Sequence, residues 1–260
     1  MEAQHQLGLM LLGEELSISP IGNNMRSILD LGTGTGIWAM DVADKFPDAH
    51  VIGVDISPIQ PEFTPPNCSF QIDDIEEDWT WRHPFDFIFA RHLAGCIRDL
   101  RGIINRSYRA LKPGGYLEMH EFDYTAHCDD GTLKKDSWLA RWAQLNNTAA
   151  EKIGRPTDFA PRLKQVFVEA GFEDVQATIK RCPTNDWPRD KILKEIGCFT
   201  FETLGNELES ISLARFKRGL DWGYDSTVVL CAMARRDFLN RGVHAYFKFH
   251  VVSGRKPISA

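Results

Sequence analysis

The sequence lacks the features that mark a metal site, a membrane segment or a secreted protein. Six cysteines are scattered over 260 residues, and no two of them have the C-x-x-C spacing of a zinc or redox site. We therefore expect free thiols, no bound metal and a reducing compartment. Every apolar run is too short to cross a bilayer. The first residues lack the basic region of a signal peptide, so we expect a cytoplasmic protein with no membrane partner.

An excess of basic charge is also missing. Asp and Glu number 36 against 30 Lys and Arg, which gives a net charge of -6. This balance argues against nucleic acid as a partner. There is no internal repeat and no low-complexity tract. Hydrophobic residues make up 43% of the chain, which suffices for the core of one α/β domain. We therefore predict a single domain over residues 1–260.

Strand and helix patterns alternate through the first half of the chain. Short apolar segments predict strands at 27–31, 50–55, 68–72, 85–90 and 116–120, and helical spacing predicts helices at 36–46 and 100–111. Buried apolar strands that alternate with helices indicate a parallel sheet with right-handed crossovers. The Lys-Pro-Gly-Gly segment at 112–115 predicts a turn before the fifth strand.

The second half of the chain is less regular. Helices are expected at 137–154 and 161–170, a strand at 175–180, mostly helical structure from 186 to 240, and a last strand at 245–252. No segment has the composition of a linker that would divide the chain.

The most informative segment is Ile-Leu-Asp-Leu-Gly-Thr-Gly-Thr-Gly at 28–36, where a strand runs into glycines and then a helix. Glycines allow positive φ and let the backbone approach a ligand closely. A dinucleotide-binding turn needs a small third residue where Ile37 stands, and no Gly-Lys-Ser/Thr follows for a phosphate loop. Asp30, two residues before the first glycine, suits a cofactor with an ammonium group. The alternative is a tight turn capped by a buried Asp30.

Acidic residues follow the next two strands. Asp55 ends the second strand, about 20 residues past the glycine turn, where an acid can accept hydrogen bonds from both ribose hydroxyls. NAD enzymes share this feature. After the third strand, Asp73 and Asp74 precede Ile75. An acid here can accept from an adenine amine while Ile75 packs on the ring; we favour Asp74, with Asp73 as the alternative. Each signal alone could be a cap or a solvated loop, but their order and spacing favour an adenosine ligand.

With these segments the sequence resembles the class I S-adenosylmethionine methyltransferases, and more narrowly the fungal LaeA-like group of secondary metabolism. The segments that carry the resemblance are 28–38, 51–61, 72–79, 111–116, 151–155 and 244–257. The resemblance implies S-adenosyl-L-methionine as the cofactor. It also implies a doubly wound, Rossmann-like α/β fold with a seven-stranded, mostly parallel sheet. The last strand of this sheet is expected to be antiparallel, and the fold is expected to contain helical insertions.

The resemblance also divides the chain by role. Residues 1–26 would form a helical lid, 27–125 the cofactor-binding half, and 126–160 with 186–240 the helical insertions on the substrate side. Family members usually have a longer N-terminal extension, so we expect a short lid or a trimmed form. The expected cofactor-binding residues are Asp30, Gly32, Thr33, Gly34, Gly36, Asp55, Ile56, Asp73, Asp74, Ile75 and Arg91.

Methyl transfer needs an acceptor aligned with the methyl group, and a nearby histidine or carboxylate can remove its proton. His92 follows the fourth strand and Glu121 the predicted fifth strand, and we predict both as catalytic residues lining the site. The alternative for each is a polar cap at a strand end.

Three functions fit these patterns. The first is methylation of N or O on a small-molecule secondary metabolite. The second is a cofactor-binding regulator that acts through protein partners in the nucleus. The third is a methyltransferase fold that catalyses another reaction, such as a cyclisation. The sequence predicts no oligomeric state.

Overall fold

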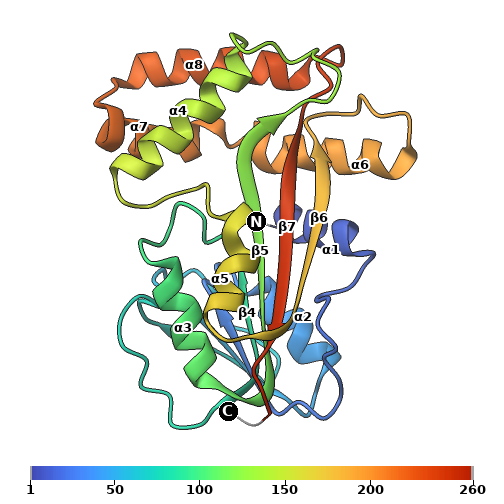
Figure 1. Ribbon diagram of the computed structural model, residues 1–260, viewed down its shortest axis with the longest axis vertical. Coiled ribbons are helices and arrows are strands. Elements are labelled where there is room, and N and C mark those ends of the chain that lie inside the picture. Colours follow the sequence, from blue (N-terminus) through green and yellow to red (C-terminus); the bar gives the residue numbers. More distant parts are fainter. Residues whose placement is uncertain (1, 259–260) are drawn as a thin grey trace.

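The computed structural model describes residues 2–258, which form one seven-stranded sheet of order β3-β2-β1-β4-β5-β7-β6 (Figure 1). The strands are β1 (Ser27–Leu31), β2 (His50–Asp55), β3 (Cys68–Ile72), β4 (Phe85–Arg91), β5 (Leu111–His127), β6 (Glu173–Pro183) and β7 (Tyr246–Arg255). Only β7 runs antiparallel to its neighbours β5 and β6. The predicted doubly wound, mostly parallel sheet with an antiparallel last strand is therefore confirmed.

Helices cover both faces of the sheet and extend above it. They are α1 (Glu2–Leu12), α2 (Ile37–Lys45), α3 (Leu100–Ala110), α4 (Trp138–Lys152), η1 (Ala160–Arg162), α5 (Leu163–Glu169), α6 (Lys191–Thr200), η2 (Phe201–Gly205), α7 (Leu208–Leu220) and α8 (Tyr224–Leu239). One apolar core joins α2 to β1, β2 and β4, and a second joins α3 and α5 to the other face. No helix within residues 2–258 has the length and apolar character needed to cross a bilayer.

The strands β5, β6 and β7 are much longer than β1 to β4. They rise past the rest of the sheet to a layer built from α4, α6, α7 and α8 (Figure 1). A third core fills this layer, with Trp142, Phe216 and Phe238 all fully buried. The helical content expected between 186 and 240 is present as α6, η2, α7 and α8.

The fifth strand differs from the prediction at both ends. At its start, the expected turn belongs to β5, and the Gly114 N–H donates to the Lys256 carbonyl at 2.9 Å. At its other end β5 continues beyond His120, and Glu121, Phe122 and Asp123 remain paired with β7. The polar residues that suggested a strand end are instead buried within the strand.

The packing of the turn between β1 and α2 predicts that Gly36→Ala lowers stability more than the same substitution at an open turn. Gly36 has φ 81°, and a Cβ there would overlap the ring of Phe70. Gly131 has φ 74°, but a Cβ added there would have no other atom within 4 Å. Gly36→Ala should lower the free energy of unfolding by about 2–5 kcal/mol, from backbone strain plus overlap. Gly131→Ala should cost about 1–2 kcal/mol from strain alone. Equal costs in urea denaturation would contradict the close contact with Phe70.

Candidate functional site

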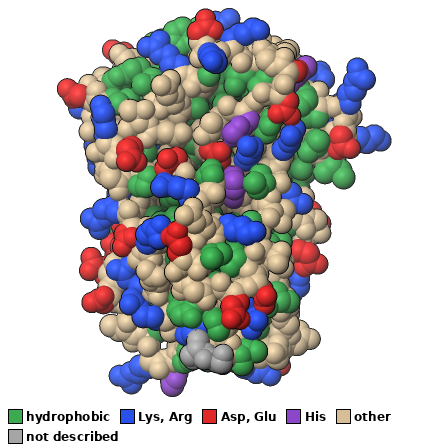
Figure 2. All heavy atoms as spheres, viewed as in Figure 1, with side chains coloured by type: hydrophobic (Ala, Val, Ile, Leu, Met, Phe, Trp, Pro, Cys, Tyr) green, Lys and Arg blue, Asp and Glu red, His purple; other side chains and the backbone are tan. Residues whose placement is uncertain are grey.

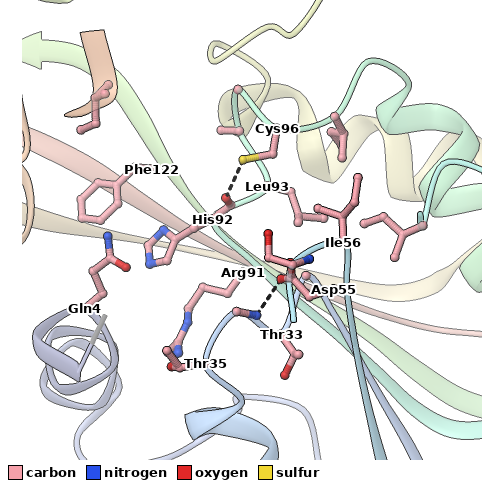
Figure 3. A pocket seen from close by; sticks show the side chains of 18 of the residues that line it. Gln4, Thr33, Thr35, Asp55, Ile56, Arg91, His92, Leu93, Cys96 and Phe122 are labelled. Atoms are coloured by element: carbon pink, nitrogen blue, oxygen red, sulfur yellow. Dashed lines mark hydrogen bonds between the residues drawn. The ribbon is translucent and has the colours of Figure 1, made fainter. Parts of the chain in front are cut away.

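A cavity of about 1020 Å³ lies beyond the carboxyl ends of β1, β2 and β4. Its floor comes from the loops that follow these strands, and residues of α1, η2 and α7 complete its wall. Figure 3 shows Arg91, His92 and Phe122 converging on this space, with Gln4 reaching in from α1. The carboxyl edge of a parallel sheet is where doubly wound folds bind ligands.

The glycine turn forms the floor of the cavity. Gly32 and Gly34 have φ values of 68° and 59°, in the left-handed region that glycine adopts without strain. A Cβ at Gly32 would lie 2.6 Å from a methyl group of Leu93. Below the turn, Thr33 Oγ1 donates to Asp30 Oδ2 at 2.6 Å. Burial raises the pKa of Asp30 to about 6, against the effects of Thr33 and the Arg91 charge.

Asp55 holds the glycine turn against the end of β2. Its Oδ2 accepts from the Gly34 N–H at 2.8 Å (Figure 3), and its Oδ1 accepts from the Ser57 N–H at 2.9 Å. Gln60 Nε2 adds a bond to the Gly34 carbonyl at 2.6 Å. The carboxylate therefore lines the cavity with both oxygens positioned by backbone donors.

The loop after β3 lines the same side of the cavity. Asp73 and Asp74 lie there with Ile56 and Ile75. The Asp73 carboxylate accepts from the N–H of Asp74 at 2.8 Å, and the Asp74 carboxylate accepts from the N–H of Glu76 at 2.9 Å. The structure thus brings together all the predicted cofactor-binding residues except Gly36, which lies behind the turn against Phe70.

Arg91 connects the cavity to α1. Its Nη2 lies 3.1 Å from His5 Nδ1, and His5 Nε2 lies 2.8 Å from Asp41 Oδ2. Burial lowers the pKa of Arg91 to about 10, and the charges of Asp30 and Asp41 oppose that shift. Gln4 and His5 had no signal in the sequence, because a short apolar run with one histidine does not reveal which strand end it covers.

His92 lies on the cavity wall in an unusual conformation. Its φ of 59° is left-handed, which is uncommon for a residue with a side chain. Its ring stacks on Phe122 at 5.5 Å between centroids. The backbone N–H of His92 donates to the His120 carbonyl at 3.0 Å. Burial, with the charge of Arg91 nearby, lowers the pKa of His92 well below its usual value. The imidazole is therefore neutral.

Glu121 does not reach the cavity, so the expectation that it lines the site needs correction. It is fully buried within β5, and its two carboxylate oxygens accept from the backbone N–H groups of Leu93 at 2.8 Å and Ala94 at 3.0 Å. Burial raises its pKa to about 8 against these two hydrogen bonds. Glu121 shapes the loop that carries His92 and Leu93 from behind the wall.

A second buried carboxylate on β5 anchors the segment between α1 and β1. Glu118 accepts from the Ser17 hydroxyl at 2.8 Å, from the Ile18 N–H at 2.9 Å and from the Ser19 N–H at 2.8 Å. His120 Nε2 lies 2.6 Å from Glu118 Oε1. The N-terminal segment is therefore tied to the centre of the sheet by one acidic side chain.

The roof of the cavity consists of residues that the sequence did not single out. They come from the π-helical turn η2 and from α7, and include Leu204, Ile211, Arg215 and Arg218. Tyr124 on β5 and Cys96 lie below them. Burial raises the pKa of Tyr124 to about 12, so its phenol is protonated.

The model of a family described as a methyltransferase domain matches residues 4–177. The chain belongs to this family. It is 38% identical to the methyltransferase pytC of Aspergillus terreus, over 97% of this chain and 78% of that protein. It is 36% identical to the secondary metabolism regulator LAE1 of Cochliobolus heterostrophus, over 99% of this chain and 86% of that protein.

A solved structure shares the fold of this methyltransferase. A phosphoethanolamine N-methyltransferase of Haemonchus contortus, crystallised with S-adenosylhomocysteine, superposes with a TM-score of 0.56 at 18% identity. The alignment covers 97% of this chain and 52% of that enzyme, so the chain spans about half of its length. This similarity concerns the architecture of the sheet and its helices.

The environment of Glu121 predicts a pH-dependent effect on stability. Glu121→Gln replaces one accepting oxygen by an amide that cannot accept from a backbone N–H. At pH 5 this should lower the free energy of unfolding by about 1–3 kcal/mol. Because the pKa of Glu121 is raised from 4.5 to about 8, the folded wild type binds a proton that the unfolded chain releases between these values. Wild-type stability should therefore fall relative to the variant as pH rises from 5 to 8.

Urea denaturation at several pH values measures this difference. Glu195→Gln, at an exposed position on α6, is the matched control and should stay within about 0.5 kcal/mol of wild type. A stability advantage of wild type over Glu121→Gln that stays constant or grows toward pH 8 would contradict the raised pKa.

Proposed function

We propose that this methyltransferase binds S-adenosyl-L-methionine in the cavity and transfers its methyl group to N or O of a small-molecule secondary metabolite. The observation that carries the proposal is the meeting of the glycine turn, Asp55 and the Asp74–Ile75 pair along one wall. These groups suit an adenosine with an attached amino acid. The relatives named above support a place in fungal secondary metabolism.

The donors and acceptors on this wall fit that cofactor. Each Asp55 oxygen accepts one backbone N–H and retains a lone pair for a ribose hydroxyl. Gly32 and Gly34 add no side chain of their own to the floor, and Leu93 occupies the space next to Gly32. Asp30, Asp55, Asp73 and Asp74 make the wall acidic, which favours a ligand with ammonium and sulfonium charges over one with phosphates.

Held by Asp55 and the Asp74–Ile75 pair, S-adenosyl-L-methionine would supply a methyl group activated by its positively charged sulfur, and the proton of the acceptor would pass to the neutral imidazole of His92. The chain contributes position and a dry environment. Phe122, Leu204 and Ile211 give the upper part of the cavity an apolar lining. The neutral imidazole of His92 faces the same space and can accept a hydrogen bond from the acceptor.

The second candidate is a regulator that binds the same cofactor and acts through a protein partner in the nucleus. The observation that favours it is the 36% identity with LAE1. This candidate predicts a stable complex in a pull-down and a nuclear protein, whereas the enzyme acting on a metabolite needs neither and is proposed to be cytoplasmic.

Calorimetric titration tests the cofactor site. Wild type should bind S-adenosylmethionine and S-adenosylhomocysteine but not NAD. Asp55→Ala should weaken both by about 10- to 100-fold, because it removes charge-assisted hydrogen bonds to the ribose. Glu62→Gln, at an exposed acid outside the cavity, is the control and should bind as wild type does. Equal binding by wild type and Asp55→Ala would contradict the assigned wall, and preference for NAD would overturn the cofactor.

Product analysis tests the reaction. Purified protein with S-adenosylmethionine and a panel of fungal phenols, amines and indoles should give a methylated product and S-adenosylhomocysteine in equal amounts. His92→Phe retains the stacking on Phe122 but cannot accept a proton, so it should slow turnover by about 10²-fold or more while cofactor affinity stays unchanged. Binding of the cofactor without any product would favour the regulator.

A further inference from the structure

The roof of the cavity holds a positive charge that the protein does not neutralise. Arg215 on α7 is half-buried and lines the cavity. Its Nη1 donates to Asn146 Oδ1 at 2.6 Å, and it makes no ion pair with a carboxylate anywhere in residues 2–258. A guanidinium does not lose its proton in a protein, and a desolvated charge without a partner is unfavourable. A ligand with an anionic group would supply the missing partner.

The neighbours of Arg215 are also donors. Because Arg215 has only N–H groups to offer, Asn146 must turn its oxygen toward the arginine. The Asn146 Nδ2 is then left buried without a hydrogen-bond partner among the described residues. The protonated phenol of Tyr124 lies on the same part of the cavity wall. Among the described residues, Arg215 is therefore bonded to one neutral acceptor and to no carboxylate, and Tyr124 places a hydroxyl donor on the same cavity wall.

The other charges of the roof are arranged differently. Arg155 donates to the Cys96 carbonyl and lies 3.7 Å from Glu76, so its charge is already paired. Glu202 and Glu207 are exposed at the rim and accept from residues of their own turns, at 3.1 Å from Asn206 and 2.5 Å from Ser210. Solvent screens those carboxylates. Figure 2 likewise shows acidic and basic side chains interspersed over one face of the surface, without a large patch of one sign.

We infer that the methyl acceptor carries a carboxylate that binds Arg215, with its reactive N or O directed toward His92. Arginine binds a planar carboxylate through two parallel hydrogen bonds, which orients the ligand as well as holding it. Arg218, one helical turn further along α7, lines the same cavity, but it is exposed, so solvent screens its charge as it screens those of Glu202 and Glu207. This inference rests on the proposed function, since it names the acceptor class for that site.

Matched pairs of small aromatic ligands test the inference. 4-Hydroxybenzoate, anthranilate and indole-3-acetate are each compared with the corresponding primary amide, by titration into protein saturated with S-adenosylhomocysteine. Tryptamine is added as a positively charged ligand for comparison with the acids. At least one acid should bind, and its amide should bind about 10-fold or more weakly. Arg215→Met should weaken that acid by about 10- to 100-fold and leave the amide unchanged. The affinity of Arg215→Lys for the acid should lie between those of wild type and Arg215→Met.

Lys217→Met is the matched control, because it removes the same charge from an exposed position on the same helix, where Lys217 pairs with Asp221. It should bind the acid as wild type does. The affinity for S-adenosylhomocysteine distinguishes failure of the proposed function from failure of the carboxylate inference. If wild type does not bind S-adenosylhomocysteine, the proposed function fails. If wild type binds it but no acid is preferred over its amide, or tryptamine is preferred over the acids, the carboxylate inference is overturned. The comparison of acid with amide on wild type holds even if Arg215→Met does not fold.

Discussion

The left-handed backbone of the turn between β1 and α2 is the constraint on which the rest of the site depends. Gly32, Gly34 and Gly36 all have positive φ, and this path lets the Gly34 N–H reach Asp55 at the end of the neighbouring strand. Leu93 and Phe70 fill the space that side chains at Gly32 and Gly36 would occupy. The turn thus joins the ends of β1, β2 and β4 into one surface, and its glycines are required by packing on both sides.

On and behind this surface the protein buries several ionisable groups, wholly or in part. Burial removes these groups from the water that would solvate their charge, and hydrogen bonds hold each of them in place. They are Asp30, Arg91, Glu118 and Glu121. Such groups are stable only when fully satisfied, and they then define one geometry closely. Here they join segments that are far apart in the chain: α1 through Arg91, the segment after α1 through Glu118, and the His92 loop through Glu121.

The sequence revealed those parts of the molecule whose signals are local. The strands β1 to β4 are short apolar runs, and the glycine turn with Asp55 and Asp74 has a characteristic order, so both were predictable. The second half of β5 was not, because Glu121 and Asp123 look like the residues of a loop. Glu121 is tolerated in a buried strand because its partners arrive from another loop, whereas Asp123 is bonded within β5 itself, by Thr125 and His127. Arg215 belongs to a short basic cluster typical of a solvated helix face, and the direction of that face depends on how α7 packs on α4.

The length of β5, β6 and β7 has a consequence for how this cavity admits ligands. These strands run from the floor of the cavity to its roof, interrupted by register shifts rather than by a linker. Floor and roof are therefore joined by continuous strands rather than by a linker, which limits how far they can move apart. In the proposed function, cofactor and acceptor would share this cavity of about 1020 Å³. The span of the sheet would then limit the acceptor by molecular size, in addition to the side chains of the roof.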